Sequence, residues 1–129
     1  MERHGLVPRV EPGLFTEASG VAAAARIFAS GEPCTAIFAG NDLSALGALD
    51  VIDGLGLTVP GDVSLVGYDN TFIAALHHIS LTSVDQNRER LGELAVTLLI
   101  ERLDNGHSHA VHEVVQPELV VRTTTAPPR

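Results

Sequence analysis

Apolar residues gather in short runs along this chain, and between the runs they recur at the spacing of a helix. Four runs bounded by Gly, Pro or polar residues are typical of short buried strands. They lie at 35–39, 63–66, 80–84 and 118–123. Three stretches of good helix formers or helical spacing predict helices. They lie at 16–28, 43–52 and 88–104.

Helices and strands alternate in this order, with short loops rich in Gly and Pro between them. Such alternation is typical of right-handed crossovers, so the predicted fold class is α/β, with a parallel sheet flanked by helices. We expect Asp42 to cap the second helix and Gly67 to end the strand at 63–66. Residues 1–14 predict an opening loop.

Asp69 lies just past the end of the strand at 63–66. In an open α/β sheet, ligands bind beyond the carboxyl ends of the strands, where the loops diverge. A carboxylate there can accept hydrogen bonds from the hydroxyl or N–H groups of a small ligand. The alternative is that Asp69 only caps the turn that begins near Asn70.

The helix predicted at 88–104 is apolar on more than one side. Leucines recur along it at helical spacing, and Val96 and Ile100 lie outside that stripe. We therefore expect another element to cover this helix.

Composition and charge exclude several classes of protein. The 129 residues are 45% hydrophobic and 19% charged, as expected for one folded domain. The net charge is -8, and all eight basic residues are arginines without a basic patch, which argues against direct nucleic-acid binding. The single Cys34 cannot form an internal disulfide, in agreement with a reducing compartment. No apolar run approaches the roughly 18 residues of a membrane span.

Other candidate sites have little support in the sequence. His107, His109 and His112 lie close together, but no carboxylate or thiolate is in register with them, which argues against a metal site. The segment 54–56 lacks the third glycine of a dinucleotide-binding turn and follows a helix. No serine has the surroundings of a nucleophile. We therefore predict no catalytic residue, no metal, no cofactor and no enzymatic activity.

Several segments taken together resemble one family. Their sequences are TAIFAGND at 35–42, GLTVPGDVSLVGYDN at 56–70, LTSVDQ at 81–86 and PELVVRTT at 117–124. In this order they resemble the C-terminal part of the effector-binding domain of transcriptional regulators of the lactose-repressor type, the LacI/GalR family.

The resemblance implies one incomplete lobe of a two-lobed fold like that of periplasmic sugar-binding proteins (type I). Residues 1–86 and 117–125 would form the second lobe, residues 87–116 would supply a helix and a strand to the first lobe, and 126–129 would be a tail. The family's DNA-binding helix-turn-helix, its hinge helix and most of the first lobe have no counterpart in the sequence. We therefore expect the chain to be a fragment.

The resemblance also implies four effector-binding positions. Phe15 matches an aromatic residue that stacks on a sugar or a base. Asn41 and Gln86 match amides that bind hydroxyl groups, and Asp69 matches the carboxylate described above. Phe15 could equally belong to the core, and Asn41 could serve only as a turn residue.

Two surfaces resemble those through which family members form dimers, one on the helix at 43–52 and one in the segment after residue 71. Both present apolar residues where a monomer would prefer polar ones, although the same residues could fill the core of the lobe. The predicted interface residues are Leu46, Asp50, Ile73, Leu76 and His77.

These features predict the effector-sensing and dimerisation part of a LacI-type transcriptional repressor. Its expected partners are a sugar or similar small metabolite and a second copy of the chain, while DNA would be bound only through a domain absent from the sequence. The expected location is the cytoplasm, without a membrane partner. A periplasmic sugar-binding protein of an ABC transporter is the alternative, and an unrelated doubly wound dehydrogenase or reductase is a third hypothesis.

Overall fold

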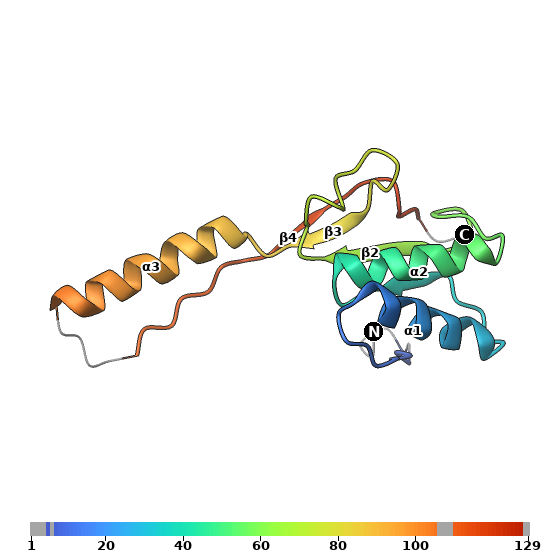
Figure 1. Ribbon diagram of the computed structural model, residues 1–129, viewed down its shortest axis with the longest axis horizontal. Coiled ribbons are helices and arrows are strands. Elements are labelled where there is room, and N and C mark those ends of the chain that lie inside the picture. The colour runs from blue at the N-terminus through green and yellow to red at the C-terminus, as the bar shows by residue number, and fades with distance from the viewer. Residues whose placement is uncertain (1–4, 6, 106–109, 128–129) are drawn as a thin grey trace.

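Helices and strands alternate along the chain in the computed structural model, which describes residues 5, 7–105 and 110–127 (Figure 1). The helices are α1 Glu17–Ala29, α2 Asp42–Gly54 and α3 Arg88–Asn105. The strands are β1 Ala36–Phe38, β2 Ser64–Tyr68, β3 Thr82–Asp85 and β4 Glu118–Val120. Each helix and strand that the pattern of apolar residues predicts is therefore present, with ends that differ by a few residues.

The strands form one sheet in the order β1-β2-β3-β4. Strands β1, β2 and β3 are parallel, with Phe38 opposite Val66 and Tyr68 opposite Val84. Strand β4 pairs with β3 in the antiparallel direction. The predicted α/β class with a mainly parallel sheet is confirmed, and the antiparallel last strand was not indicated by the sequence pattern.

The start of α2 and the end of β2 differ from the prediction. Asn41 caps the helix, with its Oδ1 accepting the Ser44 amide at 2.9 Å, and Asp42 is the first helical residue. Strand β2 continues through Gly67 to Tyr68, so this glycine does not end the strand. It provides space instead, because a Cβ at Gly67 would lie 2.5 Å from Asp42 Oδ1.

Helix α1 packs closely against α2 through two glycines. A Cβ at Gly20 of α1 would lie 2.3 Å from the Ser44 carbonyl oxygen, and a Cβ at Gly47 of α2 would lie 2.1 Å from the Glu17 carbonyl oxygen. Because backbone meets backbone at both points, any larger residue would force the two helices apart.

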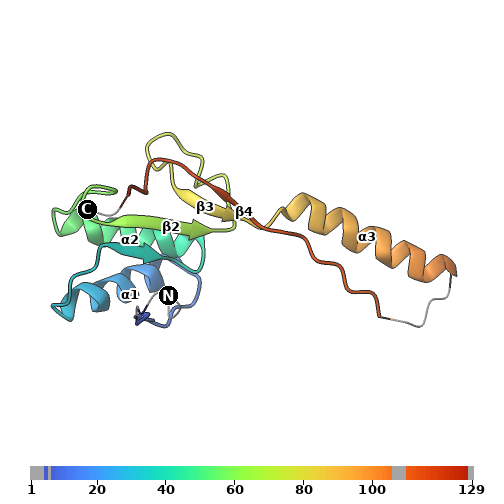
Figure 2. The ribbon, with the colours of Figure 1, turned by 180° about the vertical axis from the view of Figure 1, so that it is seen from behind.

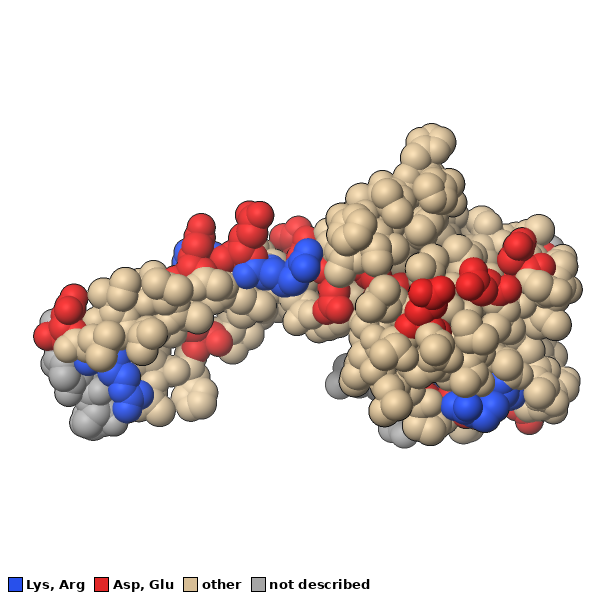
Figure 3. Space-filling view, in the orientation of Figure 1, with Lys and Arg blue, Asp and Glu red and all other residues tan. Residues whose placement is uncertain are grey.

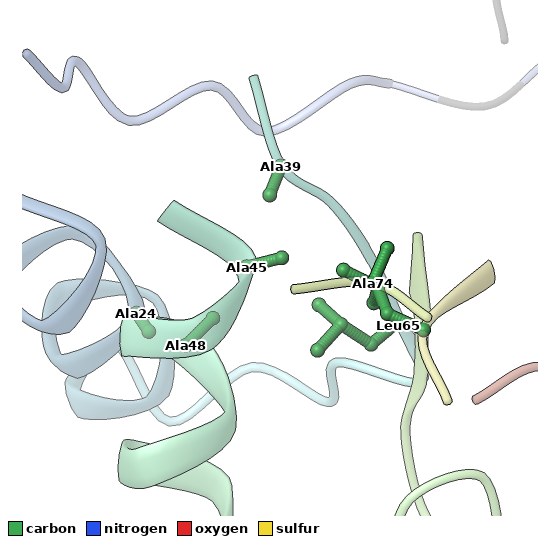
Figure 4. Packing of buried hydrophobic residues seen from close by; sticks show 7 residues of the cluster. Ala24, Ala39, Ala45, Ala48, Leu65 and Ala74 are labelled. Atoms are coloured by element: carbon green, nitrogen blue, oxygen red, sulfur yellow. The ribbon is translucent and has the colours of Figure 1, made fainter. Parts of the chain in front are cut away.

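Small aliphatic side chains fill the core between the helices and the sheet (Figure 4). The buried cluster consists of Ala24, Ala39, Ala45, Ala48, Leu65, Ala74 and Leu81. The aromatic rings of Phe15, Phe38 and Phe72 are largely exposed. The core is therefore aliphatic, as the low aromatic content of 4% suggests.

Helix α3 and residues 110–117 form an arm that extends from the lobe, which consists of α1, α2 and the sheet (Figures 1 and 2). Residues 110–117 return toward β4 in extended form, without regular secondary structure. Leu99 and Leu103 of α3 are 58% and 73% exposed, which confirms the broad apolar surface expected for this helix. Among the described residues, no helix has the length and apolarity needed to cross a membrane.

Candidate functional site

Three loops meet at the carboxyl edge of the parallel strands, because β1, β2 and β3 run in one direction. Strand β1 leads to Asn41, β2 to Asp69 and β3 to Gln86. Gln86 Nε2 donates a hydrogen bond to Asp69 Oδ1, and both side chains are half-buried. The structure therefore brings two of the four predicted effector residues into contact.

Phe15 and Asn41 form a second pair. Asn41 Nδ2 donates to the Phe15 carbonyl oxygen at 2.9 Å. Phe15 is 66% exposed, so it is not a core residue, and its ring lies beside Gly40, where a Cβ would be 3.1 Å from the ring. The exposed ring is available for stacking on a flat ligand. Part of the Asn41 amide, in contrast, already holds the Phe15 loop and the start of α2.

A buried carboxylate that the sequence reasoning missed joins these loops. Asp42 is 0% exposed, and its Oδ1 accepts the Ser83 hydroxyl at 2.6 Å. Its Oδ2 accepts the amide of Thr71 at 2.6 Å and the hydroxyl of Thr71 at 2.8 Å. This network connects the start of α2, the loop after Asp69 and strand β3. Nothing in the local sequence indicates it, because an Asp at the start of a helix is typical of an ordinary cap.

Asn70 is the centre of a second polar cluster, where the arm joins the lobe. Its Nδ2 donates to Asp85 Oδ2 at 2.8 Å, and its Oδ1 accepts from Arg122 Nη2 at 2.7 Å. The hydrogen bonds from Asn70 and from the Asn87 amide, with the charges of Arg88 and Arg122, hold the pKa of Asp85 below its usual value. The cluster ties the loop after β2 to the chain segments on both sides of the arm.

Residues 71–80 form a knob that contains no Lys, Arg, Asp or Glu and projects from the upper side of the lobe in Figure 3. Phe72 in this knob is 77% exposed, and the sequence reasoning did not single it out. The predicted interface residues are distributed over exposed and half-buried positions. Asp50, Leu76 and His77 are exposed, and Leu46 and Ile73 are half-buried.

No group of three or more potential metal ligands occurs within the part of the chain that the structure describes. Of the three neighbouring histidines, His107 and His109 lie outside that part, whereas His112 is described and exposed.

The chain is similar to known proteins over nearly its whole length. The sequence family described as a periplasmic binding protein-like domain matches residues 1–125. The HTH-type transcriptional repressor PurR of Proteus mirabilis (strain HI4320) is 40% identical over 114 residues, which make up 88% of this chain and 33% of that protein. The chain thus spans about a third of the length of the curated relatives that it matches.

Solved structures of regulators resemble the fold closely. A LacI transcriptional regulator from Rhodococcus species is 35% identical, with a TM-score of 0.91, and the match covers 98% of this chain and 47% of that chain. The complex of the transcriptional regulator CelR with cellobiose is 34% identical, with a TM-score of 0.88, and the match covers 95% of this chain and 38% of that chain.

Proposed function

Because this chain belongs to the family of periplasmic binding protein-like domains, we propose that it is the effector-binding part of a transcriptional repressor of the LacI type. The resemblance to LacI/GalR regulators that the sequence indicated is confirmed by its relatives and structural neighbours. The observation that carries the proposal is the contact between Asp69 and Gln86 at the carboxyl edge of the parallel sheet.

The chemistry of this edge suits a ligand rich in hydroxyl groups. A carboxylate offers about four acceptor sites, so Asp69 retains acceptor capacity beyond its bond with Gln86. Gln86 can donate and accept at once, and the exposed ring of Phe15 offers a flat apolar face. A ligand that covers these side chains but lacks the matching hydroxyl would leave a buried polar group unpaired, at a cost of roughly 1–3 kcal/mol. We therefore propose a sugar or a similar small metabolite as the effector.

The position of the arm suggests how a ligand could affect the rest of a regulator. Gln86 lies two residues before the start of α3, so a ligand held by Asp69 and Gln86 would touch the junction of lobe and arm. In the intact protein, the arm would reach a first lobe, and the effector would favour one arrangement of the two lobes over the other. This difference in affinity would shift DNA binding through a domain elsewhere in the protein.

A second copy of the chain is the other proposed partner. The uncharged knob exposes Phe72 and Leu76, and exposed aromatic and aliphatic residues are typical of the centre of an interface between subunits. Together with Leu46 and Asp50 of α2, the knob would form the dimer surface, and the dimer would act in the cytoplasm.

A periplasmic sugar-binding protein of a transporter would use the same architecture. The relatives favour the regulator, because the curated match is a transcriptional repressor and the solved structures are transcriptional regulators.

An NMR titration of the isotope-labelled chain tests the proposal, with a panel of mono- and disaccharides that includes cellobiose, together with nucleobases. We expect weak, roughly millimolar binding by at least one member, because one lobe covers only one face of a ligand. The amide shifts should cluster around Phe15, Asn41, Asp69 and Gln86. If no member of the panel shifts these amides, or if the shifts cluster elsewhere, the proposal fails.

A further inference from the structure

The turn that carries Asp69 has a strained backbone. Asp69 has φ 97° and Asn70 has φ 46°, so two consecutive residues other than glycine lie at positive φ. Such a conformation costs free energy and persists only where its surroundings hold it in place. Because the turn sets the direction of the Asp69 side chain, the groups that hold the turn also position the carboxylate.

Three consecutive amides of this turn have partners in the lobe. The Asp69 amide donates to a backbone carbonyl of β3 at 2.9 Å. The Asn70 amide donates to Ser83 Oγ at 3.0 Å, and the Thr71 amide donates to Asp42 Oδ2 at 2.6 Å. The last two partners are joined to each other, since the Ser83 hydroxyl donates to Asp42 Oδ1 at 2.6 Å.

Asp42 is the group on which these side-chain contacts depend. It is fully buried, and it also accepts the Thr71 hydroxyl at 2.8 Å. Hydrogen bonds to a carboxylate are stronger than bonds between neutral groups, and the amino terminus of a helix such as α2 favours a negative charge. Gly67 leaves the space that the carboxylate occupies, because a Cβ there would lie 2.5 Å from Oδ1.

We propose that Asp42 is a positioning residue of the effector site, which fixes, through Thr71 and Ser83, the turn that directs the Asp69 carboxylate toward the ligand. The preceding residue, Asn41, holds the Phe15 loop, because its Nδ2 donates to the Phe15 carbonyl oxygen. The first turn of α2 is thus the common support of two ligand-binding loops. That this site binds a ligand rests on the proposed function, whereas the role of Asp42 in holding the turn does not.

Hydrogen exchange measured by NMR on the whole 129-residue chain tests the positioning without any ligand. Asp42→Asn replaces one acceptor oxygen with a donor, so the amides of Asn70 and Thr71 should exchange about 10- to 100-fold faster. Amides of α1 and of central β2 should change by less than about 3-fold, because their partners are unaltered. Asp53→Asn, an exposed change on the same helix, is the matched control and should alter neither group of amides.

A second pair of variants keeps the test decisive if Asp42→Asn does not fold. Thr71→Val removes the hydroxyl that donates to Asp42, whereas Thr71→Ser retains it. Only Thr71→Val should accelerate exchange at residues 70 and 71, by about 10-fold.

A cellobiose titration adds a second measurement, because a residue that only stabilised the fold would not alter the affinity for cellobiose. Asp42→Asn should weaken cellobiose binding by about 10-fold or more relative to Asp53→Asn, although Asp42 itself is buried below the turn. Uniform acceleration of exchange across the lobe, unchanged exchange at residues 70 and 71, or equal cellobiose affinity in the two variants would overturn the inference. If cellobiose does not bind the wild-type chain, that result bears on the proposed function alone, and the exchange rates still decide the role of Asp42.

Discussion

Replacement of Gly47 by alanine should destabilise the lobe, although alanine is the better helix former. The new Cβ would lie 2.1 Å from the Glu17 carbonyl oxygen and 2.7 Å from the Val21 amide nitrogen, both in the backbone of α1. Overpacking of a core typically costs about 1–3 kcal/mol, and two backbones yield less easily than flexible side chains, which favours the upper end of that range. The gain in helix propensity offsets about 1 kcal/mol. The expected net loss in the free energy of unfolding is therefore about 2 kcal/mol.

Gly54→Ala provides the matched control, because Gly54 ends the same helix and a Cβ there would meet nothing within 4 Å. This variant should gain up to about 1 kcal/mol from helix propensity. Urea unfolding followed by circular dichroism measures both changes. The free energy of unfolding should fall in Gly47→Ala and rise in Gly54→Ala. If Gly47→Ala is as stable as Gly54→Ala, the close packing of α1 on α2 is not a determinant of the fold.

Two further predictions concern the pH dependence of stability at Asp85 and self-association through the arm. Because the folded state lowers the pKa of Asp85, its ionised form stabilises the fold above the unfolded pKa of about 4, and this contribution is lost as the pH falls through the lower folded pKa. Urea unfolding should therefore show that the wild type is more stable than Asp85→Asn at pH 6 and that this difference in the free energy of unfolding disappears in acid. A difference independent of pH would count against the cluster around Asn70. The chain should self-associate in sedimentation velocity, and the double change Leu99→Glu and Leu103→Glu should reduce association, because both leucines are exposed. A wild-type chain that remains monomeric at all concentrations would contradict this.

The sequence predicted the elements well where local pattern decides the structure. The alanine-rich stretch of α1 and the apolar runs of the strands were placed to within a few residues. Gly67 and Asp42 were misinterpreted, because each has an ordinary local meaning as a strand end or a helix cap. Gly67 instead leaves space for the Asp42 carboxylate, and the partner Ser83 of that carboxylate lies 41 positions away from Asp42 along the chain. Local periodicity contains no information about such a contact.

The positions of two residues of the candidate site could also be predicted from the sequence. The position of Asp69 after a strand placed it at the carboxyl edge, and the resemblance to a family added Gln86, which the structure brings into contact with it. The role of all four residues in ligand binding stays a prediction. The exposed Phe72 of the knob could not be identified in advance, because nothing in an apolar segment indicates which ring faces solvent.

Contact between the Asp69 carboxylate and the effector can be tested with one set of titrations. The panel member that binds the wild-type chain most tightly is titrated into the wild type, Asp69→Asn and Asp53→Asn. Loss of a charged acceptor should weaken binding by Asp69→Asn about 10-fold or more, while Asp53→Asn should bind as the wild type does. Equal affinity of all three chains for that ligand would contradict the assignment of the site.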